Sequence, residues 1–261
     1  IMTDLTETQL EIYAKKMLSD YDSKTPSTIF KDRVTISIKD AWRIQSAVAQ
    51  LRTTRGEKVV GYKIGCVSKK TQKEMGFTKP AWGRLWHNEI HTDGATLKKH
   101  SFSNPAMEAE FGIILKRDLL PDLISLNYIV NSIETIHPVI EIHNLVFNGH
   151  RPFGPELLAN NAIHAGVVLG TSNKGGLGSQ NTDLKLIFDN EEVDGWKDKK
   201  WPNDMLSEVE WLVKEQAKLG NILRKGNLIL TGAYGLPIPI NGKNLIEVTS
   251  SLFGKASAIF E

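Results

Sequence analysis

Two glutamates separated by a single residue lie within a largely apolar stretch, Asn104–Leu115. The alternation there is typical of a β-strand and puts Glu108 and Glu110 on one face, about 7 Å apart at a rise of roughly 3.3 Å per residue. The other face carries Met107, Ala109, Phe111 and Ile113. On a buried strand, such carboxylates lose hydration and repel each other, so they need a counter-charge, and a divalent cation is the simplest one. On a surface strand the same pair is harmless.

A third glutamate, Glu141, lies in another apolar segment, Pro138–Ile142, that also predicts a strand. Three carboxylates form a ligand set that suits Mg²⁺ or Mn²⁺ and leaves positions for water and substrate. The alternative is that these glutamates are solvated residues on half-exposed strands, which is the more common situation for glutamate.

Lys63 is the candidate for a catalytic cation. It lies in a predicted strand, Val59–Gly65, with Gly61 and Gly65 two residues to either side on its own face. These glycines leave space around the lysine or allow another backbone to come close. Lys63 could hold an oxyanion or move a proton beside a metal-bound substrate. Alternatively, it is a surface lysine on an edge strand.

Three histidines and the cysteine could also contribute. His143 follows Glu141 by two residues and so shares its face, while His137 and His164 also have apolar neighbours. For each histidine a packing or supporting role is more common than direct chemistry. The single cysteine, Cys66, excludes an internal disulfide or a cysteine-based metal site. We expect it to be buried rather than nucleophilic.

The composition sets broad limits. The chain has 261 residues, enough for one large domain or two small ones, and 32 basic against 30 acidic residues give a net charge of +2. This balance gives no reason to expect nucleic acid or membrane binding. No apolar run approaches the roughly 20 residues of a membrane span, and no signal peptide is evident. We therefore expect a cytoplasmic protein.

The elements that must position these residues are helices first and strands later. Helices are predicted from about Glu7 to Tyr21 and from Ser37 to about Gly56, so residues 1–56 form a helical N-terminal region packed on a catalytic core of residues 57–261. Shorter helices are predicted over residues 68–75, 157–161 and 204–219. Strands and helices do not alternate regularly, which favours the α+β class. No glycine-rich phosphate loop follows a strand, so nucleotide binding is unsupported.

Three segments have weaker patterns. Arg84–Ile90 predicts a strand, and Ile124–Ile136 predicts a helix. Residues 189–201 are a charged excursion with two tryptophans, which we interpret as a hairpin that is either a solvated flap or a lid.

Four stretches in order resemble the hydratase/decarboxylase branch of the fumarylacetoacetate hydrolase superfamily. Gly61–Gly65 is similar to its lysine strand, Glu108-Ala109-Glu110 to its metal-binding pair, Glu141 to its third ligand, and Leu230-Thr231-Gly232 to the turn that closes over the substrate carboxylate. The resemblance runs from about residue 38 to the end of the chain.

The resemblance implies a mixed β-roll core, a Mg²⁺ or Mn²⁺ centre and a small 2-oxo acid substrate. The metal ligands would be Glu108, Glu110 and Glu141, with Lys63 catalytic. We expect the substrate to contact Thr231, Gly232, Asn161 and His143. A homo-oligomer is implied, and association with a pathway partner enzyme is conceivable.

Three departures from the family pattern concern proton transfer. The usual acid in the loop before the second strand is replaced by Ala81, the Asp-Ser-Arg that often follows the third ligand is absent, and an Asp is replaced by Asn160. We expect a metal-dependent lyase, first a 2-keto-4-pentenoate (2-hydroxypenta-2,4-dienoate) hydratase. The alternatives are a 4-oxalocrotonate-type decarboxylase, because Ala81 cannot move a proton, an acylpyruvate hydrolase, or a non-catalytic assembly partner.

Overall fold

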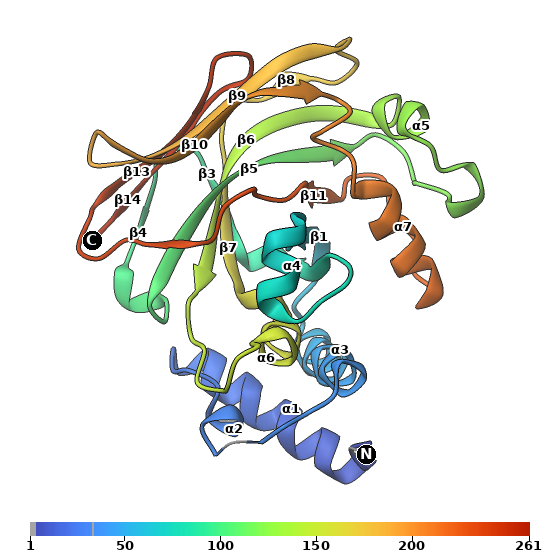
Figure 1. The fold of residues 1–261 in the computed structure, drawn as a ribbon, viewed down its shortest axis with the longest axis vertical. Helices are drawn as coiled ribbons and strands as arrows, with labels where there is room; N and C mark the ends of the chain where they lie inside the picture. Colours follow the sequence, from blue (N-terminus) through green and yellow to red (C-terminus); the bar gives the residue numbers. More distant parts are fainter. Residues whose placement is uncertain (1–3, 33) are drawn as a thin grey trace.

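The computed structural model describes residues 4–32 and 34–261, as two curved sheets with a group of helices at one end (Figure 1). The helices are α1 Glu7–Asp22, α2 Thr28–Lys31, α3 Ile38–Thr54, α4 Lys69–Met75, α5 Leu126–Val130, α6 Gly154–Ala159 and α7 Val209–Lys218. Single 3₁₀ turns occupy His87–Glu89, Lys99–Ser101, Pro121–Leu123 and Asn161–Ile163. Among the described residues, no helix has both the length and the apolar character needed to cross a bilayer.

The larger sheet holds the predicted chemistry. Its strand order is β2-β1-β11-β5-β6-β7-β3, and β12 and β8 pair with β5 and β6. The bounds are β1 Val59–Gly65, β2 Ala81–Trp86, β3 Ile90–Thr92, β5 Pro105–Leu115, β6 Ile133–Asn144, β7 His164–Leu169, β8 Asn173–Lys174, β11 Leu228–Leu230 and β12 Ile238–Pro239. Strand β1 runs parallel to β11 and antiparallel to β2, so it lies inside the sheet.

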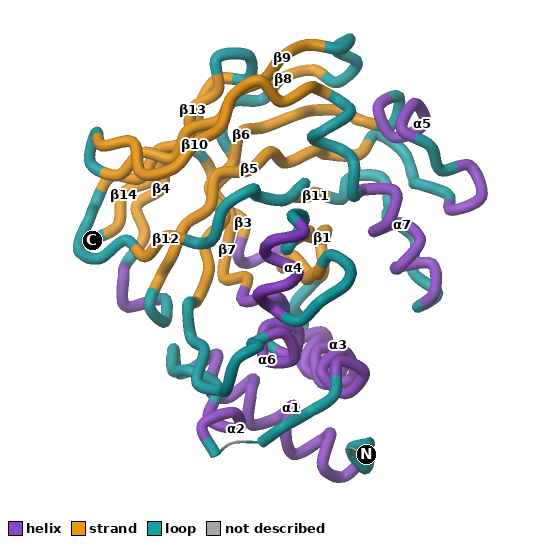
Figure 2. Tube along the Cα trace, in the orientation of Figure 1, coloured by secondary structure: helices purple, strands orange, loops and turns teal. Residues whose placement is uncertain are grey.

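The smaller sheet has the order β10-β9-β13-β14-β4 and covers one face of the larger sheet (Figure 2). Its strands are β4 Ala95–Leu97, β9 Gln180–Phe188, β10 Glu191–Trp201, β13 Leu245–Ser250 and β14 Gly254–Phe260. The two sheets meet where the ring of Phe111 on β5 packs edge-on against those of Phe253 and Trp196, at centroid distances of 5.1 and 6.1 Å. The predicted α+β class is confirmed.

The predicted hairpin at residues 189–201 is confirmed, since β9 and β10 pair antiparallel on either side of Asp189 and Asn190. Strand β10 is an edge strand of the smaller sheet with mostly exposed side chains, and Trp201 at its end is fully buried.

Two other predictions were wrong. Only Leu126–Val130 is helical within the predicted helix, since β6 begins at Ile133, and the strand predicted to start at Arg84 starts at Ala81. In both places tertiary strand pairing overrides a weak local pattern.

The helix ends follow the capping signals in the sequence. Helix α1 begins at a capping box in which the Thr6 hydroxyl accepts from the backbone of Gln9. Helix α3 begins after Ser37, whose hydroxyl accepts from Asp40, and α4 ends at Gly76 in the left-handed conformation. Helices α1 to α3 lie together at the lower end of the molecule (Figure 1). The division into regions 1–56 and 57–261 stays a prediction.

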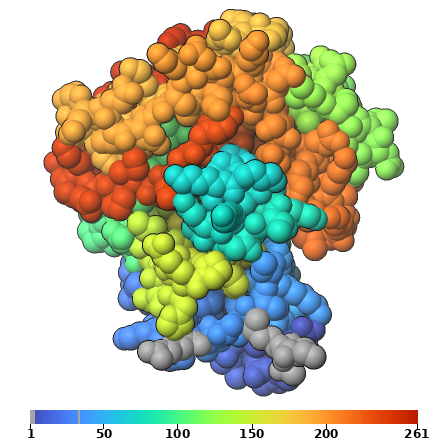
Figure 3. All heavy atoms as spheres, viewed as in Figure 1, coloured from blue at the N-terminus to red at the C-terminus, as the bar shows by residue number. Residues whose placement is uncertain are grey.

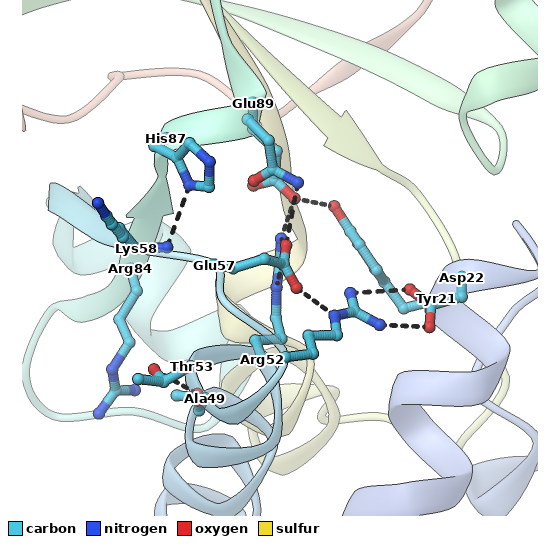
Figure 4. Close-up of polar contacts among 12 residues, drawn as sticks. Tyr21, Asp22, Ala49, Arg52, Thr53, Glu57, Lys58, Arg84, His87 and Glu89 are labelled. Carbon is cyan, nitrogen blue, oxygen red and sulfur yellow. Dashed lines mark hydrogen bonds and ion pairs between the residues drawn. The ribbon is translucent and has the colours of Figure 1, made fainter.

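A buried ionic cluster joins these helices to the larger sheet (Figure 4). The Arg52 guanidinium on α3 lies 2.6 Å from Glu57 and 2.7 Å from Glu89, and the Tyr21 hydroxyl on α1 also donates to Glu89. Burial alone would raise the pKa of Glu57, but hydrogen bonds from Arg52 and Arg55 outweigh burial and lower the pKa to about 2. The charged carboxylate is therefore the form that the fold stabilises.

Acid should weaken this cluster. The pKa of Glu57 is lower in the folded state, so its contribution to stability is present above the ordinary pKa of 4.5 and is lost as the pH falls toward 2. We expect the melting temperature of Glu57→Gln to fall less than that of the wild type between pH 5 and 2.5. Thermal unfolding followed by circular dichroism measures this, with Glu134→Gln, at an exposed site, as the control. Parallel curves for all three proteins would contradict the assignment.

A glycine sets the position of β1. A Cβ atom on Gly61 would lie 1.8 Å from the Leu228 carbonyl oxygen on the neighbouring strand β11. A side chain cannot fit there without separating the two strands, because backbone cannot yield as a side-chain end can.

We expect Gly61→Ala to destabilise the protein by about 3 kcal/mol or more, because overpacking against backbone is at the costly end of its range. The matched control is Gly178→Ala, whose Cβ would have no atom within 4 Å. Chemical denaturation of both variants provides the comparison. Equal stability of the two would show that β1 shifts freely.

Candidate functional site

Strands β5 and β6 bring the three glutamates together. Glu108 and Glu141 are direct partners across the antiparallel pair, and Glu110 is two residues further along β5 on the same face. Glu110 is 1% exposed and Glu141 is fully buried, while Glu108 is half-buried. The alternative of solvated carboxylates is therefore wrong for Glu110 and Glu141.

Glu141 uses one carboxylate oxygen for hydrogen bonds, and its other oxygen lies 3.4 Å from His143 Nε2. Its Oε1 accepts from Lys63 Nζ at 3.1 Å and from His164 Nδ1 at 2.8 Å. Its Oε2 is buried and has no hydrogen-bond partner among the described residues. A buried free carboxylate oxygen is costly unless something else binds it.

Glu110 likewise has one carboxylate oxygen that accepts a hydrogen bond from the described residues and one that does not. Its Oε2 accepts from the Gly232 amide at 2.9 Å, and its buried Oε1 has no hydrogen-bond partner in the described part of the chain. Gly232 has φ +106, and a Cβ there would lie 2.5 Å from Val67 Cγ1, so the turn needs glycine. Gly232 thus orients a carboxylate through its backbone.

Lys63 is a buried cation inside the larger sheet. Its side chain is 3% exposed and β1 is flanked on both sides, so the edge-strand alternative is wrong. A Cβ on Gly65 would lie 3.3 Å from Lys63 Nζ, which confirms that this glycine gives the lysine room. The ammonium also donates to the Ala162 carbonyl at 3.5 Å.

The Ala162 carbonyl belongs to a strained turn. Asn161, Ala162 and Ile163 all have positive φ, between +52 and +55. The Asn161 side chain holds this turn, because its Oδ1 accepts from the Arg84 amide at 2.7 Å and its Nδ2 donates to the Arg84 carbonyl at 2.9 Å. Both polar side-chain atoms of Asn161 are therefore hydrogen-bonded to the backbone of β2, and its predicted contact with substrate stays a prediction.

His143 lies among the carboxylates. Its Nε2 is 2.8 Å from Glu108 Oε2 and 3.4 Å from Glu141 Oε2. Glu108, Glu141 and His143 each offer an atom within 4.8 Å of the others, an arrangement that could hold a metal ion. Hard carboxylate oxygens, two of them buried and free, together with an imidazole, fit a divalent cation such as Mg²⁺ or Mn²⁺.

Burial and mutual charge shift the pKa values of this cluster. Burial raises the pKa of Glu110, and the Glu141 carboxylate raises it further. Burial alone would raise the pKa of Glu141, but His143 and Lys63 outweigh burial and hold it well below its usual range. Burial lowers the pKa of His143, but the carboxylates of Glu141 and Glu108 raise it to about 9. Lys63 and the imidazolium of His143 thus balance the charge of Glu108 and Glu141, while the raised pKa of Glu110 favours its neutral form.

A cavity of about 440 Å³ opens onto the cluster. Lys63, Glu108 and His143 line its polar end. Most of its remaining wall comes from three segments that border one another on the face in Figure 3: α4, the loop leading into α6, and residues 233–237. The sequence does not indicate the apolar part of this wall, because loop residues carry no periodic pattern.

Among the other predicted residues, only Cys66 lines the main cavity. The Thr231 hydroxyl donates to the Phe111 carbonyl at 3.2 Å, and with Gly232 it lines a separate small cavity. Ala81 is fully buried in the apolar cluster beneath α3 and α6.

Cys66 lines the main cavity, and burial raises the pKa of its thiol to about 11, which agrees with the expectation that it is not a nucleophile. Both ring nitrogens of His137 have partners outside the cluster, Gly170 and Thr135.

Lys63 should be essential to the stability of the metal-free protein. Lys63→Met removes the buried partner of Glu141, and breaking a buried ion pair on one side costs about 3–5 kcal/mol. We expect a correspondingly lower melting temperature, and a larger rise on adding Mn²⁺ than in the wild type. Lys58→Met, at an exposed site on the loop before β1, is the control. An unchanged melting temperature for Lys63→Met would refute its role as counter-charge.

The chain is similar in sequence to proteins named 2-keto-4-pentenoate hydratase. The chain is 30% identical over 232 residues to a 2-keto-4-pentenoate hydratase of Burkholderia vietnamiensis, covering 84% of this chain and 85% of the relative. It is 27% identical over 260 residues to a 2-keto-4-pentenoate hydratase of Paraburkholderia xenovorans, covering 98% and 97%. No protein-family model matches the chain.

The fold is similar to that of solved structures. Two structures of 4-oxalocrotonate decarboxylase from Pseudomonas putida G7, with calcium and acetate or with magnesium and adipate, match with TM-scores of 0.87 and 0.85. Each match covers 100% of both chains, at 22% and 21% sequence identity. At this identity the match establishes the fold alone.

Proposed function

The chain belongs to the 2-keto-4-pentenoate hydratase family, in the hydratase/decarboxylase branch of the fumarylacetoacetate hydrolase superfamily, and we propose that it is a divalent-metal-dependent lyase of this type. Its substrate is a small 2-oxo or 2-hydroxy alkenoic acid. The observation that carries the proposal is the buried group of three carboxylates and a lysine beside a cavity. Buried carboxylates paired with a cation beside a cavity are typical of functional sites.

The metal ligands in this proposal are Glu108, Glu110 and Glu141. The free oxygens of Glu110 and Glu141 support it, since each is buried without a hydrogen-bond partner among the described residues. His143 lies close enough to Glu108 to hold that carboxylate in place. When bound, Mg²⁺ or Mn²⁺ would act as a Lewis acid toward the oxygens of a 2-oxo carboxylate.

Lys63 stabilises negative charge on the substrate. Its ammonium is held by the Glu141 carboxylate and the Ala162 carbonyl, and it lines the polar end of the cavity. A fixed cation in a site of low dielectric constant stabilises the enolate form of the 2-oxo acid, in which the former keto oxygen carries negative charge. Hydration, decarboxylation and C–C cleavage all require that this negative charge be stabilised.

Hydration also needs a group that moves a proton, and we assign this role to His143. Ala81 replaces the acid of the family pattern and is buried in an apolar cluster. His143 lines the cavity with its ring beside Glu108, so its imidazole can contact bound substrate. The decarboxylase is the second candidate, and the missing acid at Ala81 favours it because loss of CO₂ depends mainly on stabilising the charge left behind.

We propose a homo-oligomer in the cytoplasm. The family resemblance supports the homo-oligomer, and the lone cysteine supports a reducing compartment.

Turnover assays separate the two reactions. We expect purified protein with Mg²⁺ or Mn²⁺ to hydrate 2-hydroxypenta-2,4-dienoate, observed as loss of the diene absorbance, and to lose this activity with a chelator. Release of CO₂ from 4-oxalocrotonate would instead establish the decarboxylase. If the metal-loaded protein turns over neither acid, both assignments are wrong.

Metal binding tests the ligands directly. We expect Glu108→Gln to weaken Mn²⁺ binding at least about tenfold by isothermal titration calorimetry, because a charged ligand is replaced by a neutral one. Glu134→Gln, on β6 but exposed, should bind Mn²⁺ as the wild type does. Unchanged affinity in Glu108→Gln would exclude it as a ligand.

A further inference from the structure

The cavity has a second, apolar end beyond its polar residues. Phe147, Phe153 and Leu157 line it there, on the loop before α6 and on α6 itself. The two phenyl rings stack with centroids 4.6 Å apart and planes 8° apart, and Leu157 is 6% exposed. This wall is continuous with the site, because the same cavity includes Lys63 and Glu108.

Few of the described charged residues line this cavity outside its polar end. Apart from the polar end, the charged residues among the described lining are Arg151 and Glu74, and both are exposed. The Arg151 guanidinium lies 5.7 Å from the Phe153 ring centre, and its exposed side chain also lines the cavity. Because both residues are exposed, solvent screens their charges. A second carboxylate placed along the phenyl wall would lose its hydration without a buried cation to compensate.

The volume is larger than a five-carbon acid needs. Cavities of roughly 300–1,000 Å³ hold drug-sized ligands, and this one measures about 440 Å³. Apolar side chains along that length favour a ligand that buries apolar surface against them.

We infer that the natural substrate is a 2-oxo or 2-hydroxy alkenoic monocarboxylate with an uncharged, apolar tail longer than that of pentenoate, lying along Phe147, Phe153 and Leu157. This inference rests on the proposed function, since it takes the carboxylate end to be held at Lys63 and the glutamates. It excludes a dicarboxylate as the preferred substrate.

Binding of acids that lack the reactive diene tests the inference without turnover. We use the Mn²⁺-loaded full chain and titrate pyruvate, 2-oxooctanoate and 2-oxoadipate by calorimetry. We expect 2-oxooctanoate to bind at least about tenfold more tightly than pyruvate, since each buried methylene contributes about fourfold. We expect 2-oxoadipate to bind no more tightly than pyruvate.

Variants locate the tail. Phe147→Ala should reduce the preference for 2-oxooctanoate over pyruvate about fivefold or more. Phe102→Ala, a half-buried phenylalanine that packs on Phe260 in the smaller sheet, should leave that preference unchanged. Arg151→Gln should also leave it unchanged.

Three outcomes would overturn the inference. If pyruvate and 2-oxooctanoate bind equally, the apolar wall does not select the tail. If 2-oxoadipate binds most tightly and Arg151→Gln removes its advantage, the substrate is a dicarboxylate held at the mouth. In both cases the proposed lyase stands. If none of the acids binds the Mn²⁺-loaded protein, the proposed function fails together with this inference.

Discussion

The repulsion among three neighbouring carboxylates is the constraint on which the rest of this structure depends. Glu110 and Glu141 are buried beside Glu108, and bare carboxylates could not be held there. In the metal-free protein, Lys63 and the imidazole of His143 supply the compensating charge. The fold therefore has to bring a lysine and a histidine from separate strands to one point.

Several local features that look unrelated serve this requirement. The close approach of β1 to β11 at Gly61 keeps Lys63 within the sheet, and the strained turn that contains Ala162 offers its ammonium a carbonyl. Asn161 holds that turn against β2, and Gly232 holds one oxygen of Glu110. Each is a backbone conformation fixed by a hydrogen bond or by steric necessity, and together they orient the charged groups before any ligand arrives.

The two ends of the cavity are built differently. The charged end lies mainly on paired strands in the middle of the larger sheet, where position is fixed by the hydrogen-bond ladder. The apolar end lies mainly on a short helix, α6, and the loop before it. Such segments change more readily than paired strands. Substitutions at the apolar end therefore need not disturb the charged end.

The sequence by itself determined the local elements and the chemical type of the site. Alternation predicted β5 with its glutamates on one face, capping residues predicted the starts of α1 and α3, and the glycines around Lys63 predicted its crowded strand. Only the tertiary structure decided burial, because an alternating strand has the same pattern whether its polar face meets water or another element. It also showed that Asn161 supports a turn against β2, and it revealed the wall at Phe147 and Phe153. Those roles arise from contacts between distant segments, which no local pattern records.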